Sequence, residues 1–147
     1  MRADEATRAE VLKTLAEYAR AFEAADQNAI MALQLQDQDL RFIGSGLDEW
    51  RDGVENVRAQ VRRDFTQARK LILVFTEVHV CAEGTAAWIA APTTVRVHFG
   101  DNRVREYFGR FTAVLVKRDG RWLFTQVHFS TPAAGKPEGQ SFPMYYD

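Results

Sequence analysis

The Asp119-Gly120 pair constrains the fold of this chain more than any other feature. It lies between two long stretches, 104–116 and 121–130, which are rich in β-branched, aromatic and other apolar residues. Asp-Gly favours a tight type I′ turn, whose twist matches that of the strands on either side. The sequence therefore predicts a long antiparallel β-hairpin near its C-terminal end.

Two further strands are expected before this hairpin. Residues 71–81 and 85–99 are rich in apolar and β-branched side chains, and Glu83-Gly84 supplies a turn between them. A second turn is predicted at Asp101-Asn102. The second half of the chain is therefore expected to form a meander of antiparallel strands.

The first half of the chain predicts three helices and one short strand. Apolar residues recur at helical spacing from Val11 to Ala25, and Asp4 can cap the start of this helix. Asn28 can cap a short second helix, a strand is expected over 40–43, and a third helix begins after Asp52-Gly53. Helices followed by a meander predict an α+β domain, with three helices covering one face of a cone-shaped, strongly curved antiparallel sheet.

The length and the distribution of Pro and Gly indicate one domain and a tail. A chain of 147 residues with 46% hydrophobic residues can bury a substantial core. We expect this domain to span residues 1–132. Pro and Gly mark residues 133–147 as a loose tail, although Phe142, Tyr145 and Tyr146 indicate that part of it docks.

Charge and composition argue against several classes of protein. With 19 Lys and Arg against 20 Asp and Glu, the net charge of −1 gives no global attraction to nucleic acid or an anionic membrane. No signal peptide and no apolar run of about 20 residues is present, so a cytoplasmic protein is expected. The single cysteine, Cys81, and three histidines on separate predicted strands predict neither a disulfide nor a metal or other cofactor.

Residue pairs counted back from the predicted turns assign the strand residues to two faces. The mixed face combines aromatic and polar side chains, and the other face is apolar almost throughout. In this register Trp88 lies opposite His79, Tyr107 opposite Arg96, Phe111 opposite His128 and Ala113 opposite Gln126. The apolar face includes Val80, Ile89, Val95, Val97, Phe108, Val127 and Phe129.

The composition of these faces predicts a pocket and an interface. Ligand pockets have apolar walls with a few convergent polar groups, so the mixed face is expected to line a cavity. The apolar face needs a covering partner, which predicts a homodimer through the outer face of the sheet. A single β-bulge would exchange the faces beyond it, and Arg110 is the first residue we would move between them.

An aromatic pocket with two polar anchors is the resulting site prediction. Its expected lining is Phe42, Trp50, Trp88, Tyr107, Phe111, Gln126 and His128. Such a pocket favours a neutral or weakly polar ring compound over a phosphate or a sugar. His128 is the general acid/base candidate, because an imidazole has an ordinary pKa near 6.5. A histidine satisfied by hydrogen bonds within the core is an equally open alternative.

Three stretches of the sequence resemble the nuclear-transport-factor-2-like superfamily, and within it the SnoaL-like domains. They are 41–44 with 48–50, Gly109-Arg110-Phe111-Thr112, and 117–122 leading to His128-Phe129-Ser130. The last stretch also resembles the end of the association domain of calcium/calmodulin-dependent kinase II. The resemblance covers nearly the whole chain and implies a cone-shaped domain, usually dimeric, with a pocket between sheet and helices.

The resemblance implies less about chemistry, because one scaffold carries unrelated functions. Superfamily enzymes include ketosteroid isomerases and SnoaL-like polyketide cyclases, and the isomerases keep an aspartate base near the end of the first strand. The matching stretch here, 42–46, contains no carboxylate, although Asp39, Asp48 and Glu49 lie close by in sequence. This departure counts against an isomerase.

Three functions therefore stay open from the sequence. The first is a domain that binds a small, largely apolar molecule. The second is a cofactor-free enzyme, similar to a ketosteroid isomerase or a polyketide cyclase, with His128 as acid/base. The third is an oligomeric association module. A carboxylate or histidine with a shifted pKa facing a closed cavity would distinguish the second function from the first.

Overall fold

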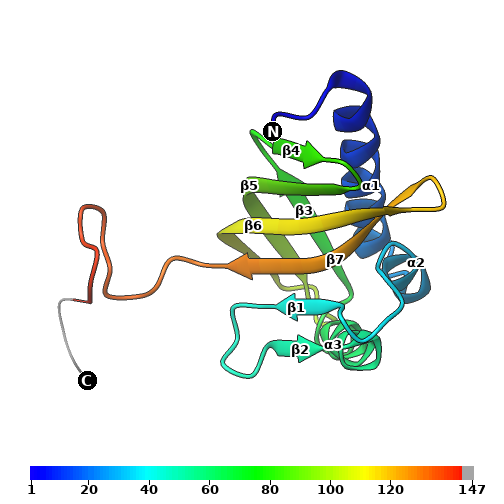
Figure 1. Cartoon of the computed structure of the whole chain (residues 1–147). Coiled ribbons are helices and arrows are strands. Elements are labelled where there is room, and N and C mark those ends of the chain that lie inside the picture. The colour runs from blue at the N-terminus through cyan, green and yellow to red at the C-terminus, as the bar shows by residue number, and fades with distance from the viewer. Residues whose placement is uncertain (144–147) are drawn as a thin grey trace.

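A computed structural model describes residues 1–143 of the chain, and these form an α+β domain, as the sequence predicts, around a single sheet (Figure 1). The elements in chain order are α1 (Glu5–Glu23), α2 (Gln27–Ala32), β1 (Arg41–Ile43), β2 (Trp50–Asp52), α3 (Val54–Gln67), β3 (Lys70–Phe75), β4 (His79–Glu83), β5 (Ala86–His98), β6 (Val104–Arg118) and β7 (Arg121–Ser130).

The helices begin where local chemistry satisfies their free backbone N–H groups. The Asp4 carboxylate accepts a hydrogen bond from the backbone of Thr7 at 2.7 Å, which confirms the predicted cap of α1. The cap of α2 is Asp26, whose side chain accepts from the Ala29 backbone at 3.0 Å, and not Asn28 as predicted. α3 starts after Gly53, where a φ of +84° favours glycine.

The strands form one curved sheet in the order β2-β1-β7-β6-β5-β3, and β4 pairs with the other half of β5 (Figure 1). All pairs are antiparallel except β1 with β7, which is parallel. The curved antiparallel sheet of the prediction is therefore confirmed, with one parallel pair added where the chain returns from the helices.

Two strand boundaries differ from the prediction. The stretch 71–81 forms two strands, β3 and β4, because the chain turns at 76–78, where Glu77 adopts a φ of +49°. Trp50 lies in β2, a strand that the sequence analysis does not predict and whose three residues pair with β1. β2 is too short to show strand periodicity, so the sequence carried no signal for it.

The predicted register fails at three places. At the turn between β4 and β5 Trp88 lies opposite Cys81 and not His79, a shift of two residues that leaves the faces of the strands unchanged. At the other two places the pairing shifts by one residue. The β5–β6 loop spans 99–103 and not a two-residue turn, so Tyr107 lies opposite Val95 and not Arg96. The Asp119-Gly120 turn pairs Arg118 with Arg121 as predicted. Beyond Leu115, however, a β-bulge places Phe111 opposite Phe129 and not His128.

These shifts overturn the assignment of the two faces. We call the face covered by α1 and α3 the inner face of the sheet, and the opposite one the outer face. Val80, Ile89 and Val127, which were predicted to face outward, are buried in the core beside α1. The apolar face is thus covered in large part by the chain's own helices, and the prediction that it points outward is wrong.

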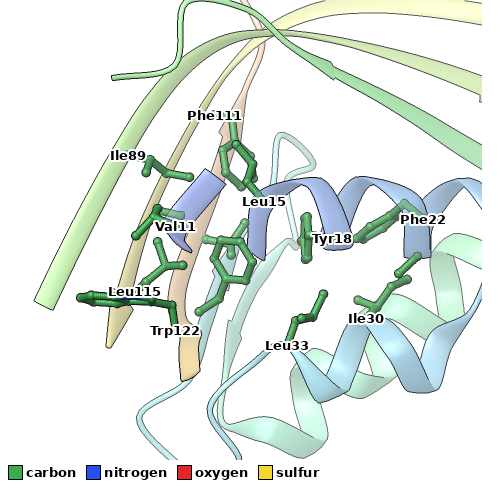
Figure 2. Close-up of a cluster of buried hydrophobic side chains, with 14 of the residues drawn as sticks. Val11, Leu15, Tyr18, Phe22, Ile30, Leu33, Ile89, Phe111, Leu115 and Trp122 are labelled. Carbon is green, nitrogen blue, oxygen red and sulfur yellow. The ribbon is translucent and has the colours of Figure 1, made fainter. Parts of the chain in front are cut away.

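α1 supplies the main contacts to the inner face. Val11, Leu15, Tyr18 and Phe22 recur at helical spacing and are at most 6% exposed. Figure 2 shows these side chains gathered with labelled residues of the sheet and α2 in one apolar cluster. Phe124 lies in this core and is completely buried. Burial at about 25 cal/mol per Å² makes this cluster the principal source of stability.

The tail leaves the sheet after β7. Figure 1 shows the chain beyond Ser130 extending away from the helices and strands. Phe142 is 79% exposed. Tyr145 and Tyr146 lie outside the described residues. The docking of the tail therefore stays a prediction.

Candidate functional site

A pocket of about 260 Å³ lies between the inner face of the sheet, α1 and the end of α3. Its walls are mostly apolar. They are built from Phe22, Leu71, Leu73, Phe75, Val95, Val97, Phe111, Val127 and Phe129, together with Phe42 of β1. Polar side chains reach it at a few points only, from Tyr18, Ser45, Glu49, Asp64, Thr93, Tyr107 and Thr131.

Aromatic rings form the floor of this pocket. The Tyr18 ring packs on Phe22, and the Phe75 ring packs on Phe111, with centroid separations of 4.8 and 4.9 Å and tilts of 60° in both pairs. Tilted pairs at this distance are the favourable arrangement for aromatic side chains. The floor is therefore preorganised before any ligand arrives.

The structure brings together three of the seven predicted pocket residues. Phe42, Tyr107 and Phe111 all line the pocket. Tyr107 is 43% exposed, which places it at the mouth, and Phe111 is buried at the floor. Trp50, Trp88, Gln126 and His128 are absent from its lining.

His128 and Gln126 lie on the outer face because of the β-bulge. Beyond Leu115 the β6 partners of Gln126 and His128 are Val114 and Thr112, while their chain neighbour Val127 turns into the pocket. One extra residue in a strand exchanges its two faces. The prediction that His128 and Gln126 face the cavity is therefore wrong.

The two tryptophans also lie elsewhere. Trp88 pairs with Cys81 of β4 and Val114 of β6 on the outer face, because its neighbours Ala87 and Ile89 are buried on the inner one. Trp50 is 60% exposed, and its indole Nε1 donates to the Asp52 carboxylate at 3.1 Å. Neither residue can contact a ligand within the pocket as the structure stands.

Two carboxylates that the sequence analysis did not select line the pocket instead. Asp64 lies in the last turn of α3, and Glu49 lies in the loop before β2. Gln60 lies one turn before Asp64 on the same helix face and is 1% exposed. The amide Nε2 of Gln60 donates to Asp64 Oδ1 at 2.8 Å and to Glu49 Oε1 at 3.1 Å.

Glu49 is held by three donors. Besides Gln60, the Arg63 guanidinium donates to Glu49 Oε1 at 3.2 Å, and the Gly46 backbone N–H donates to Oε2 at 2.7 Å. A side chain at Gly44 would overlap the Glu49 carboxylate, so the glycine leaves room for this arrangement. Both oxygens of Glu49 are thus occupied by hydrogen-bond donors.

The Asp64 carboxylate accepts only the hydrogen bond from Gln60 among the described residues. Burial beside the apolar wall raises the pKa of the Asp64 carboxyl to about 6, and the nearby negative charge of Glu49 acts in the same direction. The Gln60 hydrogen bond and the charges of Arg63 and Arg51 partly oppose the increase. A carboxyl with this pKa can both accept and release a proton near neutral pH.

Tyr18 contributes a neutral hydroxyl to the same pocket. Its side chain is 3% exposed, and burial raises the pKa of the phenol well above its ordinary value of 10, with the Asp64 charge adding to the effect. The hydroxyl therefore stays protonated and can donate a hydrogen bond. The pocket thus combines a titratable carboxyl, a neutral donor and apolar walls.

The sequence held a weak signal for Asp64 and Gln60. The apolar stripe Val57, Val61 and Phe65 of α3 is visible from periodicity, and Gln60 and Asp64 lie directly beside it. A polar residue at the edge of such a stripe faces either water or a cavity, and only the packing of α3 on the sheet shows which. Glu49 carried no comparable signal.

A larger hollow of about 640 Å³ lies between the N-terminal segment and β4. Its walls carry charges of both signs, from Arg2, Glu5, Arg8 and Glu77. Binding sites for small molecules are mostly apolar with few polar groups, so the aromatic pocket is the better candidate.

In residues 1–143 no three His, Cys, Asp or Glu side chains are placed to hold a metal ion. No helix within that range is both long and apolar enough to cross a membrane.

Comparison of the sequence with known protein families identifies the class of protein to which this fold and its pocket between sheet and helices belong. The model of the SnoaL-like domain family matches residues 11–134. The chain belongs to this family, as the resemblance of its motifs implied. No curated protein matches the chain.

Solved structures of the same fold extend the comparison. A nuclear transport factor 2-like superfamily protein from Salmonella enterica is 20% identical, with a TM-score of 0.81 over 93% of this chain and 99% of that one. A candidate dehydratase of the NTF2-like family from Streptomyces avermitilis is 15% identical, with a TM-score of 0.82 over 90% and 100%. A candidate calcium/calmodulin-dependent kinase II association domain from Xanthomonas campestris is 20% identical, with a TM-score of 0.74 over 90% of each chain. At these identities the comparisons show the fold alone.

Proposed function

We propose that the protein binds a small, largely apolar ring compound in the aromatic pocket and that Asp64 transfers a proton on it. The observation that carries this proposal is the position of Asp64. It is a carboxyl with a pKa raised to about 6, and it lines an apolar pocket. Such a group is a functional-site candidate, because burying it costs stability and needs a compensating role.

The chemistry that fits these groups is proton abstraction next to a carbonyl. The Asp64 carboxylate takes a proton from a carbon, and the electron pair moves onto the carbonyl oxygen to form an enolate. The Tyr18 hydroxyl, a neutral donor in the same pocket, is suited to stabilise that oxygen. The proton then returns from Asp64, either to the same carbon or to another position of the substrate. Atoms and electrons balance in this reaction without an oxidant or a metal.

The neighbouring structures are consistent with this assignment without deciding it. The Streptomyces avermitilis protein is a candidate dehydratase, and dehydration commonly begins with removal of a proton from carbon. The acid/base role moves here from His128 to Asp64, because His128 lies on the outer face. A domain that binds its ligand without turnover is the competing function, and the experiment below separates the two.

The experiment follows hydrogen–deuterium exchange at the carbon next to the carbonyl of 2-tetralone in D2O by proton NMR. We expect the protein to accelerate this exchange above the buffer rate. Because general acid/base catalysis contributes about 10²–10⁴-fold, Asp64→Asn should bring the rate close to that of buffer. Asp39→Asn, which changes an exposed carboxyl, is the matched control and should keep the full rate.

Binding is measured separately by the effect of 2-tetralone on the melting temperature. A raised melting temperature without faster exchange would support a binding domain and refute the role of Asp64. Exchange that survives in Asp64→Asn would refute it as well. If neither 2-tetralone nor a panel of related bicyclic ketones binds, the ligand class is wrong.

A further inference from the structure

Gln60 occupies an unusual position for an amide side chain. It lies in the middle of α3 and is 1% exposed, yet its two polar side-chain atoms make three hydrogen bonds, all to charged residues. Nε2 donates to Asp64 and Glu49, at 2.8 and 3.1 Å, and Oε1 accepts from Arg51 Nε at 3.0 Å. One buried amide thus connects β2, the preceding loop and α3.

The partners of Gln60 permit only one orientation of its amide. A guanidinium carries donors alone, so Arg51 requires the carbonyl oxygen of the amide. The carboxylates of Asp64 and Glu49 are acceptors, so they require its NH2 group. Turning the amide over would set Oε1 against two carboxylates and Nε2 against a cation. Arg51 therefore determines which way the amide of Gln60 points.

The contact with Gln60 also distinguishes the two oxygens of Asp64. Oδ1 is engaged by Gln60, whereas Oδ2 has no hydrogen-bond partner in residues 1–143. Since Asp64 lines the pocket, Oδ2 is the oxygen left for a ligand. Four other charged or titratable groups lie near Asp64. They are Arg51 on β2, Glu49 in the loop before β2, Tyr18 on α1, and Arg63, the neighbour of Asp64 on α3.

We propose that Gln60 is a positioning residue, oriented by Arg51, which holds the Asp64 carboxyl with one oxygen free toward the pocket. This inference rests on the proposed function of Asp64 for its chemical meaning. The alternative is that Gln60 merely fills buried space and satisfies its own polar atoms. The two differ in a property of Asp64 itself, which can be measured without any ligand.

The test is an NMR titration of the Asp64 side-chain carboxyl carbon, assigned by its loss in Asp64→Asn. Gln60→Met keeps the volume of the side chain and removes its hydrogen bonds. Because the hydrogen bond stabilises the ionised carboxylate, we expect the titration midpoint to rise by about one pH unit or more. Gln67→Met, on the exposed end of the same helix, should leave the midpoint unchanged.

Variants of Arg51 are tested in the same titration, so that the proposal can still be tested if the Gln60 variant fails to fold. Arg51→Met should also raise the midpoint, because the amide loses the group that orients it and a positive charge disappears. Arg51→Lys keeps a donor and the charge, so it should restore most of the original midpoint. Arg62→Met removes an exposed arginine of α3 and serves as the matched control.

A midpoint that stays unchanged in a folded Gln60→Met protein would overturn the proposal. If that variant does not fold, an unchanged midpoint in Arg51→Met would overturn it instead. These results are independent of 2-tetralone exchange. If the midpoint does not shift but exchange still requires Asp64, the proposed function stands and the positioning role of Gln60 is refuted. If the midpoint shifts but exchange does not require Asp64, Gln60 positions the carboxyl and the proposed proton transfer is refuted.

Discussion

Replacing Asp64 by Asn should make the protein more stable at neutral pH, although it removes the proposed catalytic group. Burial raises the pKa of Asp64 in the folded protein from its ordinary 3.8 to about 6. In the unfolded chain the pKa returns to its ordinary value. Asparagine keeps an oxygen that can accept the Gln60 hydrogen bond, and it carries no charge that must be buried.

The sign of the pH dependence follows from proton binding. Below about pH 4 the carboxyl is protonated in both states, and its ionisation has no effect on stability. Between the two pKa values the folded protein holds the extra proton, so stability falls as pH rises. Above about pH 6 both states are ionised, and the full cost is present. The difference of about two pH units corresponds to about 3 kcal/mol.

The measurement is urea denaturation of wild type and Asp64→Asn at pH 4 and pH 7.5, at one protein concentration. At pH 7.5 the variant should be more stable by up to about 3 kcal/mol, and at pH 4 the difference should nearly vanish. Asp39→Asn is the control and should show no such pH-dependent difference. A gap between wild type and Asp64→Asn that is the same at both pH values would refute the assignment of a raised pKa to Asp64.

Three further predictions concern other parts of the molecule. His128→Ala should leave 2-tetralone exchange within about twofold of wild type, because His128 lies outside the pocket; a rate near that of buffer would contradict the position of the β-bulge. Gly109→Ala should lower the free energy of unfolding by about 1–3 kcal/mol, since the new Cβ would lie 2.5 Å from the Phe129 ring, and urea denaturation measures this loss. The homodimer through the outer face of the sheet stays a prediction, and Phe108 of that face is 60% exposed. Phe108→Glu should shift a dimer toward monomer in analytical ultracentrifugation, and a monomeric wild type would contradict the prediction.

The local elements and the family were predictable from the sequence alone. The period of the apolar residues in α1, the Asp4 cap and the Asp119-Gly120 turn all depend on residues close together in the chain. Short-range sterics and hydrogen bonding decide such features, so they survive without knowledge of the tertiary structure. The same holds for the order of helices and strands, which defined the α+β class.

The inside and outside of the sheet were decided only in three dimensions. Side chains alternate across a strand with a period of two, so a single added residue reverses every later assignment. The loop at 99–103 and the bulge near Leu115 each shift the pairing by one residue, and the bulge is what places His128 outside the pocket. Neither has a distinctive residue pattern in the sequence.

The candidate site depended on tertiary structure for a different reason. Asp64 acquires its raised pKa from burial beside strands that are distant in sequence. Within residues 1–143, the one hydrogen bond to its carboxylate comes from the amide of Gln60, which Arg51 of another element orients. The apolar stripe beside Asp64 on α3 does not by itself distinguish this residue from a solvated carboxylate. Desolvation is a property of the packed molecule, and it appears only when α3 closes over the sheet.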